Sequence, residues 1–382
     1  MSLSITQLGP ALVAVAVASG LCTAACGGAT RDSGSLPHGD GGIPAPHVDG
    51  GVGPFPPVEP DASTGPVTRT PEAGLHGHAY ETYTTTSPGA VCGLVGGPDG
   101  NVWFTLCTGN AIGRISEAGQ STRFPLPSYD PGPGVVGYGP VTIIAGGDGA
   151  LWFTQSSTQA VGRITTSGAV TTFALSSAAN AGKLAWGPDG NLWFTEVEGS
   201  KIGFMTPAGA VKELDVGGYD PNDPRSGMGG IAGAKDAVWF TQPRQNLIVR
   251  ITSSGVTKPF AVPAPDSYPT AIVADAGGNL WFLEEDGNAL GRLTPLGDFT
   301  EYPLRMPYSD PRSLAIGKNA TVWFTEPGSN QLGRVDLETS ALTEFAPPLS
   351  PMDLALASDG SVWFTSNSES SGDVMDIRHL LF

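Results

Sequence analysis

The stretch GPDGNLWFTE, residues 187–196, holds a tight turn followed by an apolar strand, and versions of it recur along the chain. Asp189-Gly190 favours a hairpin, because glycine accepts the positive φ that such a turn demands. The Trp-Phe pair behind the turn occurs seven times, 40 to 49 residues apart, at Trp103, Trp152, Trp193, Trp239, Trp281, Trp323 and Trp363. Four short strands and their turns occupy about forty residues in a propeller blade. The repeat therefore predicts an all-β fold, a seven-bladed β-propeller with four-stranded blades.

The ends of the repeat region predict how the ring closes. The last unit offers three strands, around Leu354, Trp363 and Val374, and then the chain stops. The missing fourth strand precedes the first unit, as Tyr80 to Thr85. Pairing this N-terminal strand with the three C-terminal strands removes the free edges. We therefore expect one propeller domain over residues 79–382.

Composition and net charge limit the classes of partner that this chain is expected to bind. The chain has 54 Gly and 34 Pro among 382 residues, 14% charged residues and a formal net charge of -17. Nucleic acid binding needs clustered Lys and Arg, and anionic lipid surfaces attract the same residues, so both are disfavoured. Cationic or neutral partners fit this charge, and we expect membrane contact only through a lipid anchor.

The N-terminal residues 1–26 read as a lipoprotein signal peptide. Ala11 to Leu21 is an apolar run too short to span a bilayer, and Thr23-Ala24-Ala25-Cys26 resembles a bacterial lipobox with Cys26 as the lipidated residue. No basic residue precedes Arg31, which departs from the usual pattern, and a plain buried segment is the alternative. Residues 27–78 are predicted to be a disordered Gly/Pro-rich tether. The sequence thus predicts an exported protein, lipid-anchored in the bacterial cell envelope on its periplasmic or cell-surface side.

The remaining cysteines form one pair. Cys92 and Cys107 would lie in an oxidising compartment, where disulfides persist, and both belong to the first repeat unit. A disulfide between adjacent strands is the prediction, with two buried free thiols as the alternative.

The order of strands in a blade divides the connections between two faces. The Asp-Gly turns and the third-to-fourth turns share one face, here called the turn face. The second-to-third loops share the opposite face, the loop face, with the long inter-blade loops Ser128 to Pro140, Gly217 to Gly230 and Pro265 to Pro269. Loops on a rigid scaffold tend to carry function, so we expect a small-molecule or protein ligand on the loop face.

Two positions per blade are expected near the channel mouth on that face. The glutamate slot follows Trp-Phe-X and reads Leu106, Gln155, Glu196, Gln242, Glu284, Glu326 and Ser366. The first-strand slot lies fourteen residues earlier and reads Cys92, Val141, Gly182, Met228, Thr270, Arg312 and Met352.

The unit GPDGNLWFTE, followed by KIGFMTPAGAVKEL, resembles the repeat of the streptogramin lyase (virginiamycin B lyase) family. The resemblance implies a seven-bladed propeller that linearises cyclic streptogramin B antibiotics by elimination at an ester bond, with Mg²⁺ bound. It also implies two histidines in the first-strand slots of adjacent blades and a glutamate in the glutamate slot. Glu196, Glu284 and Glu326 match the glutamate, whereas no first-strand slot holds a histidine. His379 is the one histidine after residue 78 and is interpreted as lying outside the repeat pattern.

The empty histidine slots favour a binding module over an enzyme. Elimination needs a base and an acid, and Thr270, Arg312 and Met228 cannot replace a histidine base near neutral pH. For an enzyme, the catalytic candidates are Glu284, Glu326 and Arg312. It would be a lyase with a rearranged base or a metal-dependent lactonase-type hydrolase. The metal candidates are Glu196, Glu284 and Glu326, around Mg²⁺ or Ca²⁺.

Purely structural roles remain as alternatives for these residues. The three glutamates can serve as hydrogen-bonding groups of the scaffold, and Arg312 with Glu326 can form an ion pair. The arginines of the third strands are interpreted as packing residues. A purely structural envelope protein is the third functional alternative.

Overall fold

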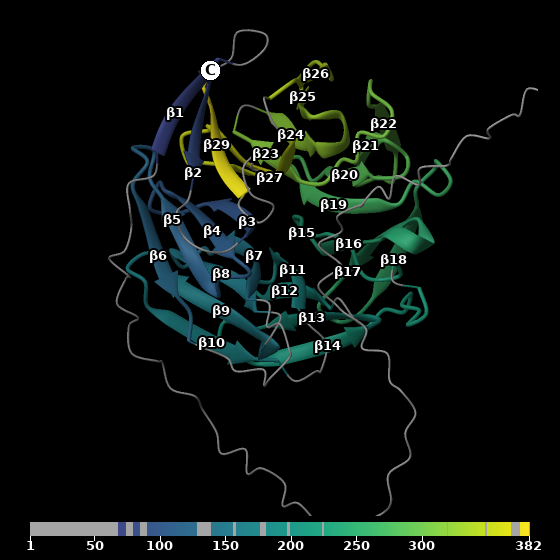
Figure 1. Cartoon of the computed structure of the whole chain (residues 1–382). Helices are drawn as coiled ribbons and strands as arrows, with labels where there is room; N and C mark the ends of the chain where they lie inside the picture. Colours follow the sequence, from purple (N-terminus) through teal and green to yellow (C-terminus); the bar gives the residue numbers. More distant parts are fainter. Residues whose placement is uncertain are drawn as a thin grey trace, which may run out of the picture. The chain divides into compact units, whose positions relative to one another are not determined.

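Each repeat unit folds into an antiparallel four-stranded sheet, and the seven sheets stand around a central axis (Figure 1). The computed structural model describes residues 68–73, 79–84, 90–127, 139–155, 158–175, 181–196, 199–223, 225–318, 320–347, 350–367 and 375–381. The predicted signal peptide, Cys26 and most of the predicted tether lie outside these residues. No described helix is long and apolar enough to cross a membrane.

Six blades are continuous in sequence and run from the inner to the outer strand. Blade 1 holds β3 (Val91–Gly96), β4 (Val102–Leu106), β5 (Ala111–Ile115) and β6 (Ser121–Pro125). Blade 2 holds β7 (Pro140–Ala145), β8 (Ala150–Gln155), β9 (Ala160–Thr165) and β10 (Val170–Ala174). Blade 3 holds β11 (Ala181–Trp186), β12 (Leu192–Glu196), β13 (Lys201–Met205) and β14 (Val211–Asp215).

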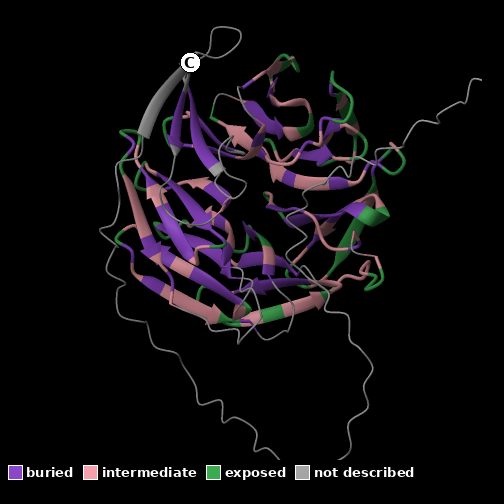
Figure 2. Cartoon of the chain, in the orientation of Figure 1, coloured by how far each residue is buried: buried purple, intermediate pink, exposed green. Residues whose placement is uncertain are grey.

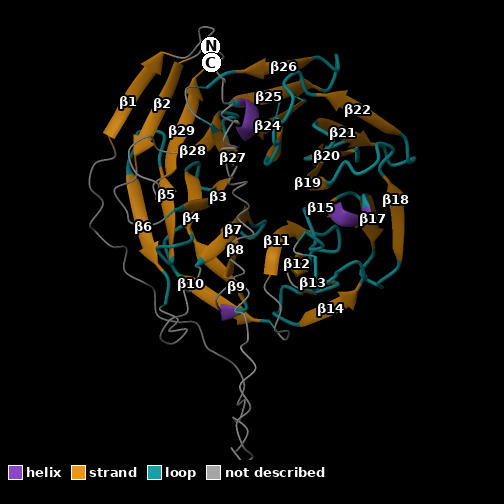
Figure 3. Cartoon of the chain, turned by 45° about the vertical axis from the view of Figure 1, so that its right-hand side comes forward, coloured by secondary structure: helices purple, strands orange, loops and turns teal. Residues whose placement is uncertain are grey.

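The next three blades follow the same order. Blade 4 holds β15 (Ile231–Gly233), β16 (Val238–Gln242), β17 (Leu247–Ile251) and β18 (Thr257–Ala261). Blade 5 holds β19 (Pro269–Ala274), β20 (Leu280–Glu284), β21 (Ala289–Leu293) and β22 (Phe299–Pro303). Blade 6 holds β23 (Leu314–Gly317), β24 (Thr321–Glu326), β25 (Gln331–Asp336) and β26 (Leu342–Phe345). The 3-10 helices η3 (Pro243–Gln245) and η4 (Pro327–Ser329) lie between the second and third strands of blades 4 and 6 (Figure 3).

Blade 7 closes the ring as the sequence predicts. Its inner strands are β27 (Pro351–Leu356), β28 (Val362–Asn367) and β29 (Met375–Leu381), and β2 (Ala79–Thr84) pairs with β29. One strand corrects the expected tether boundary at residue 78. β1 (Thr68–Ala73) pairs along its whole length with β2 and makes this sheet five-stranded. Backbone pairing with an exposed edge, which composition does not report, accounts for the difference.

The second strand of each blade is buried because the blades stack on both of its faces. All five residues of β20 are buried, whereas the outer strand β18 is largely exposed, as Figure 2 shows by colour. In blades 1, 2, 3, 5 and 6, the buried phenylalanine of the Trp-Phe pair packs against a third-strand glycine. A Cβ on Gly291 would collide with the ring of Phe282, so this glycine is required by close approach rather than by φ.

On the turn face, the same three contacts recur around the repeat tryptophans of blades 1, 2 and 5. The indole Nε1 of Trp103 donates to the turn residue Asp99 at 2.9 Å, Arg114 lies over the indole at 5.4 Å, and Phe124 stacks on it at 5.3 Å. Equivalent cation–π contacts join Arg163 to Trp152, Arg292 to Trp281 and Arg334 to Trp323. These contacts make the repeat arginines packing residues.

His379 belongs to the repeat, contrary to the sequence interpretation. It pairs with Trp363 in the register that joins Arg114 to Trp103, and its ring stacks on Trp363 at 4.5 Å. Burial lowers the pKa of His379, against the opposing effect of Glu81. The third strands of blades 1, 2, 5 and 6 carry a Gly-Arg pair, and blade 7 lacks it, so the sequence did not reveal that His379 takes the place of the arginine.

A repeated threonine hydroxyl joins neighbouring blades. Thr241 accepts the amide proton of Gly230 in its own blade at 2.9 Å and donates to the carbonyl of Thr270 in the next blade at 2.7 Å. Thr105 and Thr325 donate in the same way to the carbonyls of Val141 and Met352. The Trp-Phe-Thr sequence thus supplies both the blade core and the link to the next blade.

Candidate functional site

The glutamates of the glutamate slot end the second strands, but they are enclosed rather than open at the channel mouth. Glu196 has 1% of its surface exposed, and Glu284 and Glu326 have none. Phe282 and Glu284 point to the same side of β20, and the core of Phe282 is shared with blade 4. The expectation of accessible channel-mouth glutamates is therefore wrong, because these side chains turn into the packing between blades.

Burial sets the charge state of two of these glutamates. It raises the pKa of Glu284 to about 7, with Glu301 adding to the rise and Ser267 opposing it. It also raises the pKa of Glu326 to about 7, again against a serine hydroxyl, that of Ser309. A carboxyl that no substrate can reach cannot transfer its proton to one, so neither is placed as a catalytic acid or base.

The metal that the resemblance implies has no fitting donor set among the described residues. There, no group of three or more His, Cys, Asp or Glu side chains lies close enough to hold one ion. Glu196, Glu284 and Glu326 come from three different blades and belong to no such group, so among the described residues they do not form the shared Mg²⁺ or Ca²⁺ site considered from the sequence.

Arg312 reaches the loop face but pairs differently than expected. Its guanidinium forms an ion pair with Asp310, with Nη2 and Oδ2 2.9 Å apart and a second contact from Nε at 3.0 Å. The expected ion pair with Glu326 is therefore wrong. Asp310 lies two residues earlier, in the loop that leads into β23, and so competes for the same guanidinium.

The first-strand slots hold no free base. Cys92 is joined to Cys107 by a disulfide, as the sequence predicts, with their Cα atoms 5.9 Å apart. Thr270 has a buried hydroxyl for which the described residues provide no hydrogen-bond partner.

Blade 4 requires a correction of one residue in this slot. The amide of Gly229 donates to the carbonyl of Thr241, just as the amide of Arg312 donates to Thr325, so Gly229 and not Met228 occupies the slot. The first turn of blade 4 is one residue shorter, which shifts a count made along the sequence.

Charged and aromatic side chains from successive loops meet on the loop face. We call Arg225, Tyr268, Glu285, Asp286, Asp310 and Arg312 the loop-face cluster. Arg225 binds Asp286 at 2.8 Å, and its guanidinium lies 3.8 Å from the ring centre of Tyr268, whose hydroxyl donates to the Arg225 carbonyl at 3.0 Å. These residues come from the loops before blades 4, 5 and 6 and from the β20–β21 turn.

Glu285 lies among the charges of this cluster. Burial raises its pKa, Asp310 and Asp286 raise it further, and Arg312 and Arg225 oppose the rise. The cluster has three carboxylates for two guanidinium groups. This excess of negative charge suits a ligand that carries a positive charge or hydrogen-bond donors.

Two loops of the cluster hold non-glycine residues in the left-handed region of backbone space. Asp266 and Tyr268 have φ of 52° and 55°, and Tyr308 and Asp310 have φ of 58° and 51°. Such conformations are uncommon for these side chains and persist only where the surroundings fix them. Each pair flanks a fully buried serine, Ser267 or Ser309.

The buried serines are fixed by asparagines of the preceding blade. The hydroxyl of Ser267 donates to the side-chain amide oxygen of Asn246 at 2.9 Å. The backbone N–H of Ser309 donates to the side-chain amide oxygen of Asn288 at 2.8 Å. The loops are therefore rigid and hold Tyr268 and Asp310 toward the same face. Sequence reasoning named the loops that hold Arg225 and Tyr268, but it did not single out these two side chains. It missed Glu285 and Asp286, because the proximity of the cluster depends on four separate segments.

The profile of the virginiamycin B lyase family matches residues 81–375 of this chain. The chain belongs to this family. Its curated relatives include the virginiamycin B lyases of Bordetella pertussis and Bordetella parapertussis, each 51% identical over 47 residues. That stretch spans 12% of this chain and 16% of each relative, so the similarity to them is confined to about one blade.

Solved structures of the family share the whole propeller. A streptogramin B lyase structure is 29% identical with a TM-score of 0.68, covering 79% of this chain and 97% of that one. A catalytically inactive histidine-to-alanine variant of virginiamycin B lyase from Staphylococcus aureus, solved with quinupristin, is 28% identical with a TM-score of 0.67, covering 79% and 99%. The WD40 propeller of Doa1, 13% identical with a TM-score of 0.61 over 82% and 97%, shares the fold alone.

Proposed function

We propose that this family member is a binding propeller that holds a small ligand of the cyclic-peptide class on its loop face without opening it. The observation that carries the proposal is the loop-face cluster, a charged and aromatic surface beside which the described part of the chain places no histidine. Quinupristin with the staphylococcal relative supports the ligand class. A protein partner on the same surface is the alternative ligand.

The first-strand and glutamate slots support a non-catalytic role. In the staphylococcal relative, replacing one histidine by alanine accompanies the loss of catalysis. Here Cys92 is bonded, Arg312 is paired with Asp310, and Glu284 and Glu326 are enclosed. None of these groups can both reach a substrate and exchange a proton near neutral pH.

The proposal includes a place in the cell envelope. The apolar run and lipobox-like sequence up to Cys26 support export and lipid anchoring, and the Cys92–Cys107 disulfide supports an oxidising compartment. Radiolabelled palmitate incorporation into the full chain, lost in Cys26→Ser, is the expected result. Incorporation that survives in Cys26→Ser would contradict the anchor.

The function is tested by incubating the full-length chain with quinupristin. Chromatography is expected to show no ring opening above the heat-denatured control, while calorimetry shows saturable binding. Ring opening at a steady rate would contradict the binding role. Failure to bind would contradict the ligand class.

A second candidate function rests on Glu285. This carboxyl is half-buried, has a raised pKa and lies beside the guanidinium of Arg312, so it could accept a proton in a lyase with a rearranged base. Ring opening in the wild-type chain that disappears in Glu285→Gln would favour this enzyme.

A further inference from the structure

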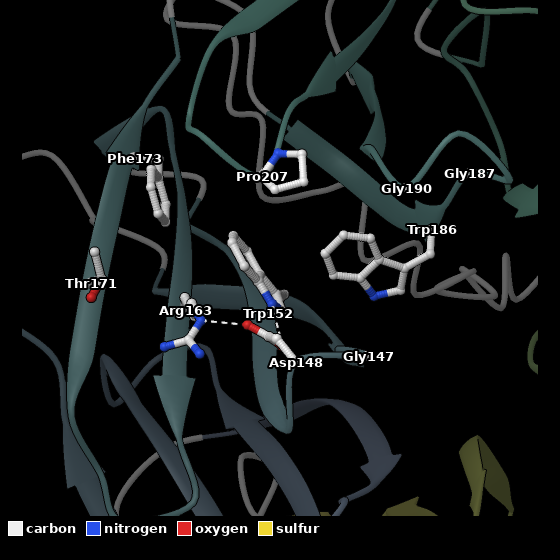
Figure 4. A pocket seen from close by; sticks show the side chains of 10 residues that line it. All are labelled: Gly147, Asp148, Trp152, Arg163, Thr171, Phe173, Trp186, Gly187, Gly190 and Pro207. Atoms are coloured by element: carbon white, nitrogen blue, oxygen red, sulfur yellow. Dashed lines mark hydrogen bonds and ion pairs between the residues drawn. The ribbon is translucent and has the colours of Figure 1, made fainter.

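The turn face carries a groove between blades 2 and 3, at the opposite strand ends from the loop-face cluster. Its volume is about 810 Å³. Figure 4 shows the indoles of Trp152 and Trp186 side by side, with Phe173 on the outer strand and Pro207 across the opening. Asp148 and Arg163 form an ion pair at its edge, with Nε and Oδ2 2.7 Å apart.

Trp186 departs from the repeat. It ends the first strand of blade 3, opposite Leu192. In the other blades the equivalent positions hold small or aliphatic residues, namely Gly96, Ala145, Gly233, Ala274, Ile316 and Leu356. The scaffold therefore does not require an indole here. Trp186 meets Trp152 edge-on, with ring centres 5.6 Å apart and planes at 88°, which gives the groove an angular aromatic wall.

The polar groups of this wall are already engaged within the protein. The indole Nε1 of Trp186 donates to the Ala145 carbonyl at 2.9 Å, and that of Trp152 donates to Asp148 at 3.3 Å. The charge of Arg163 is balanced by Asp148. The groove thus offers the partly exposed indole of Trp186, beside the buried indole of Trp152, and a neutral pair of donor and acceptor in Arg163 and Asp148, whose side chains are 27% and 39% exposed.

We propose that this groove binds an uncharged glycan, with a pyranose ring stacked on the indole of Trp186. A pyranose presents a face of C–H groups to an aromatic ring and adjacent hydroxyls at its edge, where Asp148 accepts and Arg163 donates. The self-balanced ion pair gives no advantage to a charged ligand. A proline-rich peptide fits less well, because both indole N–H groups are already used and cannot donate to its carbonyls.

The glycines of the first turns leave room for such a ring. A Cβ placed on Gly147 or Gly190 would meet no atom within 4 Å. The proposed site is independent of the loop-face ligand.

The test uses the full-length chain with soluble hexamers of β-linked glucose and of β-linked N-acetylglucosamine. Intrinsic tryptophan fluorescence is expected to change saturably with at least one hexamer. Trp186→Ala is expected to weaken that binding about tenfold, since a central aromatic carries much of the affinity. The matched variant Leu356→Ala, at the same position in blade 7, is expected to bind as the wild type does.

Thermal melting shows whether Trp186→Ala remains folded, and Asp310→Asn on the loop face is expected to keep full glycan binding. The absence of a fluorescence change with either hexamer at millimolar concentration would overturn the proposal. Decaproline binding in their place would reassign the groove to a peptide. Hexamer binding that survives Trp186→Ala would contradict the assigned site.

Discussion

The two faces of the propeller are built on opposite principles. On the turn face, blades 1, 2 and 5 repeat one aspartate–tryptophan–arginine arrangement, as in Asp99, Trp103 and Arg114. On the loop face, the described loops before blades 4, 5 and 6 contribute different charged and aromatic side chains, and among the described residues the contacts of Arg225 with Tyr268 and Asp286 occur once. Repetition marks residues that stabilise the scaffold, whereas departures from it mark places for ligands. By the same reasoning Trp186 marks a ligand site on the otherwise repetitive turn face.

The largest change in stability is expected for a residue that stabilises the scaffold. Phe324→Ala removes a fully buried ring from the packing between blades. We expect the free energy of unfolding to fall by about 3–5 kcal/mol in denaturant titrations. Tyr308→Ala on the loop face, where the side chain is 89% exposed, is expected to stay within about 0.5 kcal/mol. Equal losses in the two variants would contradict the division.

The Cys92–Cys107 disulfide tests a second difference between the two faces, because it adds a covalent link to one blade near the loop face. It closes a segment with a sequence separation of 15. Reduction is expected to cost about 3 kcal/mol of unfolding free energy. Melting curves with and without reductant measure it, and the double variant Cys92→Ser, Cys107→Ser serves as the insensitive control. A wild-type melting temperature that is unchanged by reductant would mean that the disulfide does not form.

The enclosed glutamates predict a pH dependence. Glu284 has a pKa of about 7 in the folded chain and an ordinary value of 4.5. Between these values the folded state holds the extra proton, so unfolding free energy falls as pH rises through this window. Glu284→Gln is therefore expected to gain about 1–3 kcal/mol over wild type at pH 8 and nothing near pH 4.5, by denaturant titration. A difference independent of pH would show that Glu284 does not titrate in this way.

The smallest expected effect on stability belongs to the loop-face cluster. Asp310→Asn weakens a partly exposed ion pair, so we expect a loss of about 0.2–1 kcal/mol by thermal melting. A loss above about 2 kcal/mol would place Asp310 in the scaffold instead.

The sequence predicted the propeller because its signals are local. A few consecutive residues encode each Trp-Phe pair, each Asp-Gly turn and the strand before the first repeat. Counting these units predicted that β2 closes the ring. β1 was missed because the segment Thr68–Ala73 has an unremarkable composition and includes Pro71, which an edge strand tolerates.

The candidate site was less predictable for two physical reasons. Repeat position locates Glu284 and Glu326 at the end of a strand, but it does not say whether their side chains turn into the packing between blades or out toward the channel mouth. The loop-face cluster also joins segments that are distant in the sequence, as in the ion pair of Arg225 with Asp286, which are 61 positions apart, and no local pattern reports that contact. A one-residue change in turn length was enough to place Met228 where Gly229 stands.

The most direct test of the account compares two aspartates that each form an ion pair with an arginine. Asp310 pairs with Arg312 on the loop face, and Asp236 pairs with Arg250 on the turn face at 2.6 Å. Calorimetry with quinupristin is expected to show about tenfold weaker binding for Asp310→Asn and unchanged binding for Asp236→Asn. Equal affinities in the two variants, or a loss confined to Asp236→Asn, would contradict the assignment of the ligand to the loop face.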